Sequence, residues 1–130
     1  MNLKKNNRNL ALIDDDEYWI NLIKKLFEKE YHEYKIETFK DFKKFMIFED
    51  LNNFDIIITD FYFNGYNLDL IDTNSFFNNF KGIKVLVTGY PNIVNNINIY
   101  DKIINKSSIS KQTFKFSRHL DNLINDTIKN

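Results

Sequence analysis

Hydrophobic residues recur along this chain in short runs that alternate with amphipathic stretches. Three of these runs are mainly apolar, as in strands buried on both faces of a parallel sheet, one alternates apolar with polar residues, and the last is a pair of isoleucines between two polar residues. The runs cover residues 10–13, 34–38, 54–59, 84–88 and 102–105. Each run is short, as buried strands are. The pattern therefore predicts five strands.

Apolar residues spaced three and four positions apart predict helices between these strands. The clearest helix covers about residues 17–31, and an acid before it, Asp15 or Asp16, can cap its first turn. A second helix begins at Asp41, where the helical spacing starts again. Both helices have one apolar face with which to cover a sheet.

Helix signals are weaker in the second half of the chain. Residues 61–69 contain Gly65 and are expected to form a loop, and a third helix follows it. The inward side chains of this third helix are expected to be Leu70, Ile71, Phe77 and Phe80. A short fourth helix is expected over residues 93–99, and a closing helix from Ser110.

The alternation of strands and helices predicts the fold class. Strands that alternate with helices through short connections form a parallel sheet with right-handed crossovers and helices on both faces. We therefore expect a doubly wound α/β fold with a five-stranded parallel sheet. A chain of 130 residues has room for one such core.

Composition narrows the range of partners. The 18 basic and 18 acidic residues cancel, so no net charge attracts nucleic acid or an anionic membrane. There is no cysteine, and the basic residues of segment 1–9 precede an apolar run too short for a signal peptide or a membrane span. We therefore expect a cytoplasmic protein. The 13 Phe and 7 Tyr residues are expected to build an aromatic core.

Polar residues capable of chemistry stand at the carboxyl ends of four of the five predicted strands. Asp14 and Asp15 follow the first, Asp60 and Lys106 follow the third and fifth, and Thr88 ends the fourth. Since the carboxyl ends of parallel strands share one edge of the sheet, these side chains are expected to surround one crevice. Converging carboxylates either raise a pKa or recruit a hard cation such as Mg²⁺. A hydroxyl and an ammonium beside them suit a phosphoryl group, which an aspartate can accept as a nucleophile.

With these residues in this order, the chain resembles the receiver domains of response regulators, of the chemotaxis-protein type used in two-component signalling. The resemblance covers about the whole chain. The matching motifs are Asp14-Asp15, Asp60, Val87-Thr88-Gly89 and Lys106. The resemblance implies a flavodoxin-like receiver fold with the strand order 2-1-3-4-5.

The resemblance also implies what the site does. Asp60 would accept a phosphoryl group from a sensor histidine kinase or a histidine phosphotransfer protein, and Thr88 and Lys106 would contact the phosphoryl oxygens. The ligands of a Mg²⁺ cofactor would be Asp14, Asp15, Asp60 and the backbone carbonyl of Tyr62. Such a domain catalyses at most its own phosphorylation and dephosphorylation, so we do not expect an enzyme.

The expected domain organisation is simple. Residues 1–9 would form a basic tail, and residues 10–130 a single receiver-like domain with no output domain. The signal would therefore pass to a separate output protein, which the sequence does not identify. Because members of the family often dimerise around their fifth strand, a homodimer is also possible.

The chain departs from the family pattern around the site. Ile103 stands where the family has an aromatic switch residue, Ser107 stands where it usually has a proline, and the loop after Asp60 lacks the usual proline and glycine. These changes leave open an alternative function, a phosphorylation-independent pseudo-receiver that acts as a protein-interaction module. A phosphatase of the haloacid-dehalogenase type would need a second acid at position 62, where this chain has tyrosine.

Two tyrosines, Tyr62 and Tyr90, occupy positions that in the family flank the path of hydrolytic water. Bulky rings at these positions are expected to exclude in-line water and so to prolong the life of a phosphoryl group on Asp60. The alternative is that both rings merely cover the ends of strands, as aromatic side chains often do.

Overall fold

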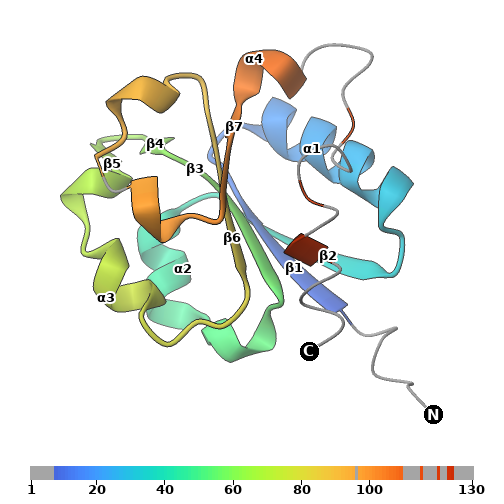
Figure 1. The fold of residues 1–130 in the computed structure, drawn as a ribbon, viewed down its shortest axis with the longest axis horizontal. Helices are drawn as coiled ribbons and strands as arrows, with labels where there is room; N and C mark the ends of the chain where they lie inside the picture. Colours follow the sequence, from blue (N-terminus) through green and yellow to red (C-terminus); the bar gives the residue numbers. More distant parts are fainter. Residues whose placement is uncertain (1–7, 96, 110–114, 116–119, 121–122, 125–130) are drawn as a thin grey trace.

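The computed structural model describes residues 8–95, 97–109, 115, 120, 123 and 124. At its centre is a five-stranded sheet in which every neighbouring pair of strands is parallel. In order across the sheet, the strands are β2 (Tyr34–Phe39), β1 (Arg8–Ile13), β3 (Ile56–Asp60), β6 (Ile83–Thr88) and β7 (Lys102–Asn105). This confirms the expected order 2-1-3-4-5 of the main strands (Figure 1). Strand β1 begins at Arg8, two residues before the predicted run.

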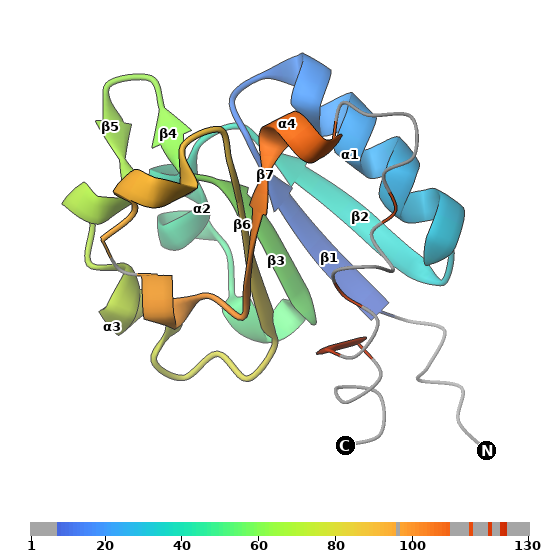
Figure 2. The same cartoon turned by 45° about the horizontal axis from the view of Figure 1, so that its top comes forward.

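Helices cover both faces of the sheet. The α-helices are α1 (Glu17–Glu30), α2 (Phe42–Phe48), α3 (Thr73–Phe77) and α4 (Lys106–Ile109). Single turns of 3-10 helix occupy Leu51–Asn53, Leu68–Leu70, Pro91–Ile93 and Ile97–Ile99. Helix α1 lies on one side of the sheet and α2 and α3 lie on the other, as Figures 1 and 2 show from two directions. The doubly wound α/β class is therefore confirmed.

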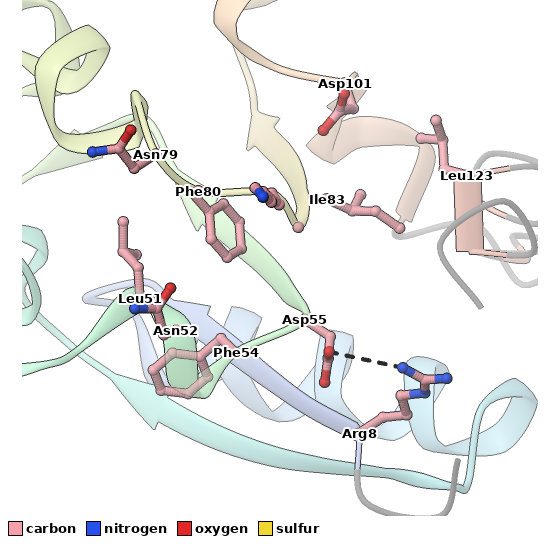
Figure 3. A pocket seen from close by; sticks show the side chains of 12 residues that line it. Arg8, Leu51, Asn52, Phe54, Asp55, Asn79, Phe80, Ile83, Asp101 and Leu123 are labelled. Carbon is pink, nitrogen blue, oxygen red and sulfur yellow. Dashed lines mark ion pairs between the residues drawn. The ribbon is translucent and has the colours of Figure 1, made fainter. Parts of the chain in front are cut away.

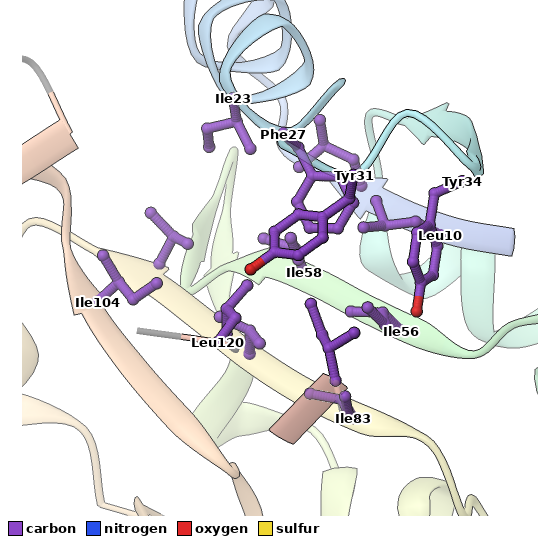
Figure 4. Close-up of a cluster of buried hydrophobic side chains, with 14 of the residues drawn as sticks. Leu10, Ile23, Phe27, Tyr31, Tyr34, Ile56, Ile58, Ile83, Ile104 and Leu120 are labelled. Carbon is purple, nitrogen blue, oxygen red and sulfur yellow. The ribbon is translucent and has the colours of Figure 1, made fainter. Parts of the chain in front are cut away.

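The face of the sheet beneath α1 has a mainly aliphatic core. Strand residues such as Leu10 and Ile58 pack there against Phe27 of α1 (Figure 4). Leu120 and Ile124 are buried in the same cluster, although most of the predicted closing helix lies outside the described residues. Each large apolar side chain removed from water in this way contributes about 1.5–3 kcal/mol to folding.

The opposite face of the sheet has an aromatic core, as the composition led us to expect. Its fully or almost fully buried phenylalanines are Phe42, Phe45, Phe54, Phe61, Phe63, Phe77 and Phe80. Many of the rings meet edge to face; those of Phe42 and Phe76, for example, have centroids 5.8 Å apart and planes at 75°. Edge-to-face contacts of this kind add about 0.5–1.5 kcal/mol to the burial of each pair.

The side chains of two aspartates, Asp16 and Asp41, cap the amino ends of α1 and α2. Asp16 accepts a hydrogen bond from the backbone N–H of Tyr18 at 2.9 Å, and Asp41 accepts one from that of Lys44 at 3.1 Å. A side-chain acceptor at this position satisfies a backbone donor that the first turn of a helix leaves unpaired. Because Asp16 caps α1, Asp14 and Asp15 are the acids that remain at the end of β1.

The segment after β3 differs from the predicted loop. It contains a short antiparallel hairpin formed by β4 (Tyr62–Phe63) and β5 (Tyr66–Asn67). Gly65 turns the hairpin with a φ of 92°, a conformation that is easy for glycine and costly for other residues. The hairpin was missed because two-residue strands are too short to show an alternating pattern.

The third and fourth predicted helices also need correction. The third begins only at Thr73, after a separate 3-10 turn, so Leu70 is 75% exposed and does not point inward, whereas Phe77 and Phe80 are buried. No α-helix forms in the described part of residues 93–99, where 3-10 turns stand instead. This stretch consists of asparagine and β-branched residues, which favour a helix less than alanine or leucine do.

Among the described residues, none of the helices is both long and apolar enough to cross a membrane.

Candidate functional site

Three carboxylates meet at the carboxyl edge of the sheet. Asp14 and Asp15 follow β1, and Asp60 ends β3, the neighbouring strand. One oxygen from each carboxylate lies within 4.8 Å of the others. The three acids line a cavity of about 620 Å³, to which Lys106 also contributes. Strand pairing thus brings together residues that are far apart in the chain.

Asp14 is almost completely buried, with 1% of its surface exposed. Its Oδ1 accepts a hydrogen bond from the backbone N–H of Asp16 at 2.9 Å, and its own N–H donates to the carbonyl of Phe39. Burial, together with the negative charge of Asp60, raises the pKa of Asp14 to about 6. A nearby positive charge favours the ionised form of Asp14 and opposes this shift.

Asp60 is also buried, and its two oxygens have different partners. Oδ1 accepts a hydrogen bond from the backbone N–H of Phe61 at 2.8 Å, while Oδ2 lies 3.2 Å from Nζ of Lys106. Burial raises the pKa of Asp60, and the positive charge of Lys106 opposes this shift. One oxygen is thus fixed by the backbone and the other faces the lysine.

Asp15, in contrast, is exposed and contacts the hairpin. Its Oδ2 accepts a hydrogen bond from the backbone N–H of Asn64 at 3.1 Å. Asn64 immediately precedes Gly65, so this bond attaches the hairpin turn to the acidic cluster. A carboxylate has lone pairs for several partners, so the bond leaves Asp15 able to bind a cation as well.

Lys106 supplies the positive charge of the site. It begins α4 directly after β7, and 14% of its side chain is exposed. Its Nζ lies 3.0 Å from Oδ2 of Asp14 and 3.2 Å from Oδ2 of Asp60. A single ammonium therefore bridges the acids of two different strands. The same nitrogen lies 5.0 Å from the centre of the Trp19 ring.

Thr88 lies at the end of β6, beside the acidic cluster. Its neighbour Val87 pairs with Asp60 across the sheet, and Thr88 itself is completely buried. Its Oγ1 accepts a hydrogen bond from the backbone N–H of Tyr90 at 3.1 Å. A hydroxyl that accepts a bond still has its own proton to donate. Thr88 is not one of the residues that line the cavity.

The two tyrosines singled out in the sequence lie together. The rings of Tyr62 and Tyr90 meet edge to face, with centroids 6.0 Å apart. Tyr62 lines the cavity, whereas Tyr90 does not and is 66% exposed. The two rings therefore contact each other at the side of the site, with Tyr62 the nearer to the acids.

A hydrogen bond that the sequence did not reveal holds the hairpin in place. The hydroxyl of Tyr66 donates to Oδ1 of Asp41 at 3.0 Å and accepts from the backbone N–H of Lys43 at 3.1 Å. The Lys43 ammonium also lies 4.4 Å from the centre of the Tyr66 ring. These residues are more than twenty positions apart, and no local pattern links them.

Ile103 and Ser107, the two residues near β7 that differ from the receiver pattern, both contact other parts of the chain. Ile103 is half-buried and packs against the aromatic core. Ser107 lies in the first turn of α4, and its backbone N–H donates to Oδ1 of Asn105 at 3.0 Å. The side chain of Asn105, the last residue of β7, thus caps the first turn of α4, from which Lys106 reaches the acids.

The donor set suits a hard divalent cation. The carboxylates of Asp14, Asp15 and Asp60 supply oxygen ligands, and Mg²⁺ is usually held by one or two carboxylates together with waters. Burial is the main cause of the raised pKa values of Asp14 and Asp60, because water solvates their negative charges less than it would at the surface. A cation at this position would compensate them.

A second cavity, of about 610 Å³, lies at the opposite edge of the sheet (Figure 3). Its acids already have partners. Oδ2 of Asp55 accepts from the backbone N–H of Asn9 at 2.9 Å, and Asp55 also lies 3.9 Å from Arg8. Asp101 accepts from the backbone N–H of Lys84 at 2.8 Å. These contacts fix the beginnings of strands, so we assign this cavity no chemistry.

No protein-family model matches the sequence, and no curated protein does either. Solved structures, however, match nearly the full chain. One is the signal receiver domain of a putative Luxo repressor protein from Vibrio parahaemolyticus, with a TM-score of 0.66 and 15% identity over 95% of this chain and 91% of that one. Another is the signal receiver domain of an HD domain-containing protein from Pseudomonas fluorescens, with a TM-score of 0.67 and 12% identity over 95% and 99%.

A third match is the response regulator protein TrrA from Thermotoga maritima, solved in complex with Mg²⁺ and BeF. Its TM-score is 0.61, with 18% identity over 92% of this chain and 98% of that one. The chain therefore has the fold of response-regulator receiver domains, as its motifs led us to expect. It also carries the cluster of three aspartates that is typical of the phospho-acceptor site in that fold.

Proposed function

We propose that this chain is a receiver that accepts a phosphoryl group on Asp60 from a phosphohistidine, in a reaction that requires Mg²⁺. The donor would be a sensor histidine kinase or a histidine phosphotransfer protein. The observation that carries the proposal is that Asp14, Asp15 and Asp60 meet in one cavity, with Lys106 bridging two of them. Similarity to receivers in fold supports it.

The proposed reaction is a simple transfer. An oxygen of Asp60 attacks phosphorus, the bond from phosphorus to the donor imidazole nitrogen breaks, and an acyl phosphate forms. The imidazole leaves with the electron pair and takes up a proton from solvent. We assign Oδ2 as the attacking oxygen, because Oδ1 is held by the backbone N–H of Phe61.

The neighbouring residues have complementary roles in this proposal. Lys106 would transfer its ion pair from Asp60 to an oxygen of the phosphoryl group, and the hydroxyl of Thr88 would donate a hydrogen bond to another. Asp14, Asp15, Asp60 and the backbone carbonyl of Tyr62 would hold the Mg²⁺. When bound, the ion would neutralise the negative charges that otherwise repel the incoming phosphoryl group.

Phosphorylation would act as a switch and not as a step of metabolism. The added charge favours one of two conformations, and a partner protein recognises that conformation. In this proposal the domain performs no chemistry beyond gaining and losing its phosphoryl group.

The direct test is labelling with acetyl phosphate, a small phosphoryl donor, followed by intact-protein mass spectrometry. We expect a mass increase of one phosphoryl group in the presence of Mg²⁺ and none after chelation with EDTA. The Asp60→Asn variant, which keeps size and polarity, should not be labelled. Labelling that persists in this variant would place the phosphoryl group elsewhere and reject the assignment.

A second function is favoured by a specific observation. Lys106 already pairs with Asp14 and Asp60, so its ammonium has anionic partners without a phosphoryl group. With Ile103 at the switch position, the same fold could serve as a phosphorylation-independent interaction module. That alternative predicts no labelling of the wild-type chain, and partner binding that is equal in wild-type and Asp60→Asn proteins.

A further inference from the structure

Trp19 is the only tryptophan of the chain and lies against the ammonium of Lys106. The distance from Nζ to the ring centre is 5.0 Å, within the range of cation–π attraction. Trp19 also lines the cavity that contains the three aspartates. Lys106 therefore has three neighbours that attract a cation: two carboxylates and one aromatic ring.

The position of the Trp19 ring is fixed by the same turn that positions Asp14. Oδ1 of Asp14 accepts from the N–H of Asp16, and Oδ1 of Asp16 accepts from the N–H of Tyr18, both at 2.9 Å. Trp19 is the next residue, in the first turn of α1. These two bonds hold the backbone between Asp14 and Tyr18, and both the Asp14 carboxylate and the Trp19 ring lie near the Lys106 ammonium.

The three neighbours respond differently to a divalent cation. A cation bound by Asp14 and Asp60 would compete with Lys106 for the same oxygens and would repel its ammonium. The Trp19 ring attracts an ammonium through its quadrupole, yet it carries no charge and offers no oxygen ligand. The ring can therefore keep its hold on Lys106 when the carboxylates cannot.

We propose that Trp19 is a positioning residue, whose ring retains the Lys106 ammonium beside Asp60 when a divalent cation displaces it from Asp14. This inference rests on the proposed function for its consequence, the delivery of Lys106 to a phosphoryl oxygen. The contact itself is a property of the unphosphorylated chain, so it can be tested without any phosphoryl donor.

The first test uses the fluorescence of Trp19. We expect titration with Mg²⁺ to change the intensity and the emission maximum in the wild-type chain, because the Lys106 ammonium loses its contact with Asp14 and is held more closely by the indole ring. In Lys106→Met, which keeps the length of the side chain but removes the charge, this change should be reduced at least about threefold, although calorimetry shows that Mg²⁺ binds. An unreduced change in Lys106→Met, or no change in the wild-type chain, would overturn the inference.

The second test compares variants of Trp19 at saturating Mg²⁺. Trp19→Leu fills the space without a π face and should slow labelling by acetyl phosphate about threefold to tenfold. Trp19→Phe keeps a ring and should restore most of the rate. Phe48→Leu removes an exposed ring that does not line the cavity of Trp19 and Lys106, and this variant should label at the wild-type rate. Circular dichroism checks that each variant is folded.

The outcomes separate the two proposals. If the wild-type chain is labelled and Trp19→Leu and Trp19→Phe are both labelled at the wild-type rate, Trp19 has no positioning role, although the proposed function stands. If the wild-type chain is not labelled, the proposed function fails, and the fluorescence test still decides whether the ring holds Lys106.

Discussion

The hydroxyl of Tyr66 donates to Asp41 Oδ1 at 3.0 Å, and this bond joins the hairpin after β3 to the first turn of α2. Asp41 caps α2, and the hairpin carries Asn64, whose N–H binds Asp15. The acidic cluster is thus connected to a second helix through a single phenolic hydroxyl.

We therefore expect Tyr66→Phe to destabilise the chain by about 1 kcal/mol, since it removes the partner of Asp41 and of the Lys43 N–H. Urea unfolding followed by circular dichroism measures this. The variant should also bind Mg²⁺ more weakly, because the turn beside Asp15 is less fixed. Tyr18→Phe, which removes an exposed hydroxyl, is the control. Equal stability of the two variants would contradict the role given to Tyr66.

The second prediction concerns pH and Asp14. The pKa of this carboxyl is raised from 3.8 to about 6 by burial and by Asp60. The carboxyl of Asp14 therefore binds its proton more tightly in the folded chain than in the unfolded chain. Protonation of Asp14 stabilises the fold fully below pH 3.8, and this stabilisation is lost as the pH rises through about 6. At neutral pH the charged carboxylate costs at most about 3 kcal/mol.

Asp14→Asn keeps the acceptor for the Asp16 N–H and removes this cost. Without a divalent cation, we expect the variant to be more stable than the wild-type chain at pH 7.5, and the gain to disappear near pH 4. Thermal unfolding at a series of pH values measures the difference. With saturating Mg²⁺, the wild-type chain should regain the advantage. A gain that is the same at both pH values would show that charge is not its cause.

The third prediction concerns the lifetime of the phosphoryl group. The Tyr62 ring lines the cavity and the Tyr90 ring packs against it from outside. If these rings exclude water, Tyr62→Asn should speed the loss of an acyl phosphate about threefold to tenfold, which corresponds to about 1 kcal/mol in the barrier. Tyr90→Ala should have a smaller effect. Decay of the labelled protein, followed by mass spectrometry, tests this, and unchanged or slower decay in Tyr62→Asn would reject the shielding role.

The fourth prediction compares two glycines. A Cβ at Gly82 would collide with the backbone carbonyl of Asp55, which accepts the N–H of Ile83 at 3.0 Å, whereas a Cβ at Gly89 would meet nothing within 4 Å. We expect Gly82→Ala to cost about 1–3 kcal/mol, as overpacking does, and Gly89→Ala to be close to neutral. Chemical denaturation of both variants measures the difference. A neutral Gly82→Ala would mean that β3 and β6 can separate at this point without cost.

The main strands were readable from the sequence because they are buried. A strand covered on both faces must be apolar throughout, so the apolar runs 56–58 and 85–87 can be recognised as strands without any knowledge of the fold. The caps Asp16 and Asp41 were also predictable, since capping depends on neighbours along the chain. The acids of the site could be proposed because they directly follow such strands.

Other features of the structure could not be predicted from the residues next to them in the sequence. Leu70 fits a helical pattern but is exposed, because a 3-10 turn interrupts the chain before Thr73. The hairpin depends on Gly65 and on the contact between Tyr66 and Asp41. The contact between Trp19 and Lys106 joins two residues that are far apart in the chain, and the helical spacing of apolar residues marks Trp19 only as an apolar position of α1.

The sequence by itself determined the layers of this protein, since burial imposes a period on each strand and helix, and it determined which residues stand at the strand ends. Only the tertiary structure decided how these residues are paired: that Lys106 lies between Asp14 and Asp60, and that Trp19 lies beside it. The reason is physical. Hydrophobic patterning is a property of each element alone, whereas an ion pair or a cation–π contact depends on the register between strands and on the turns that join them.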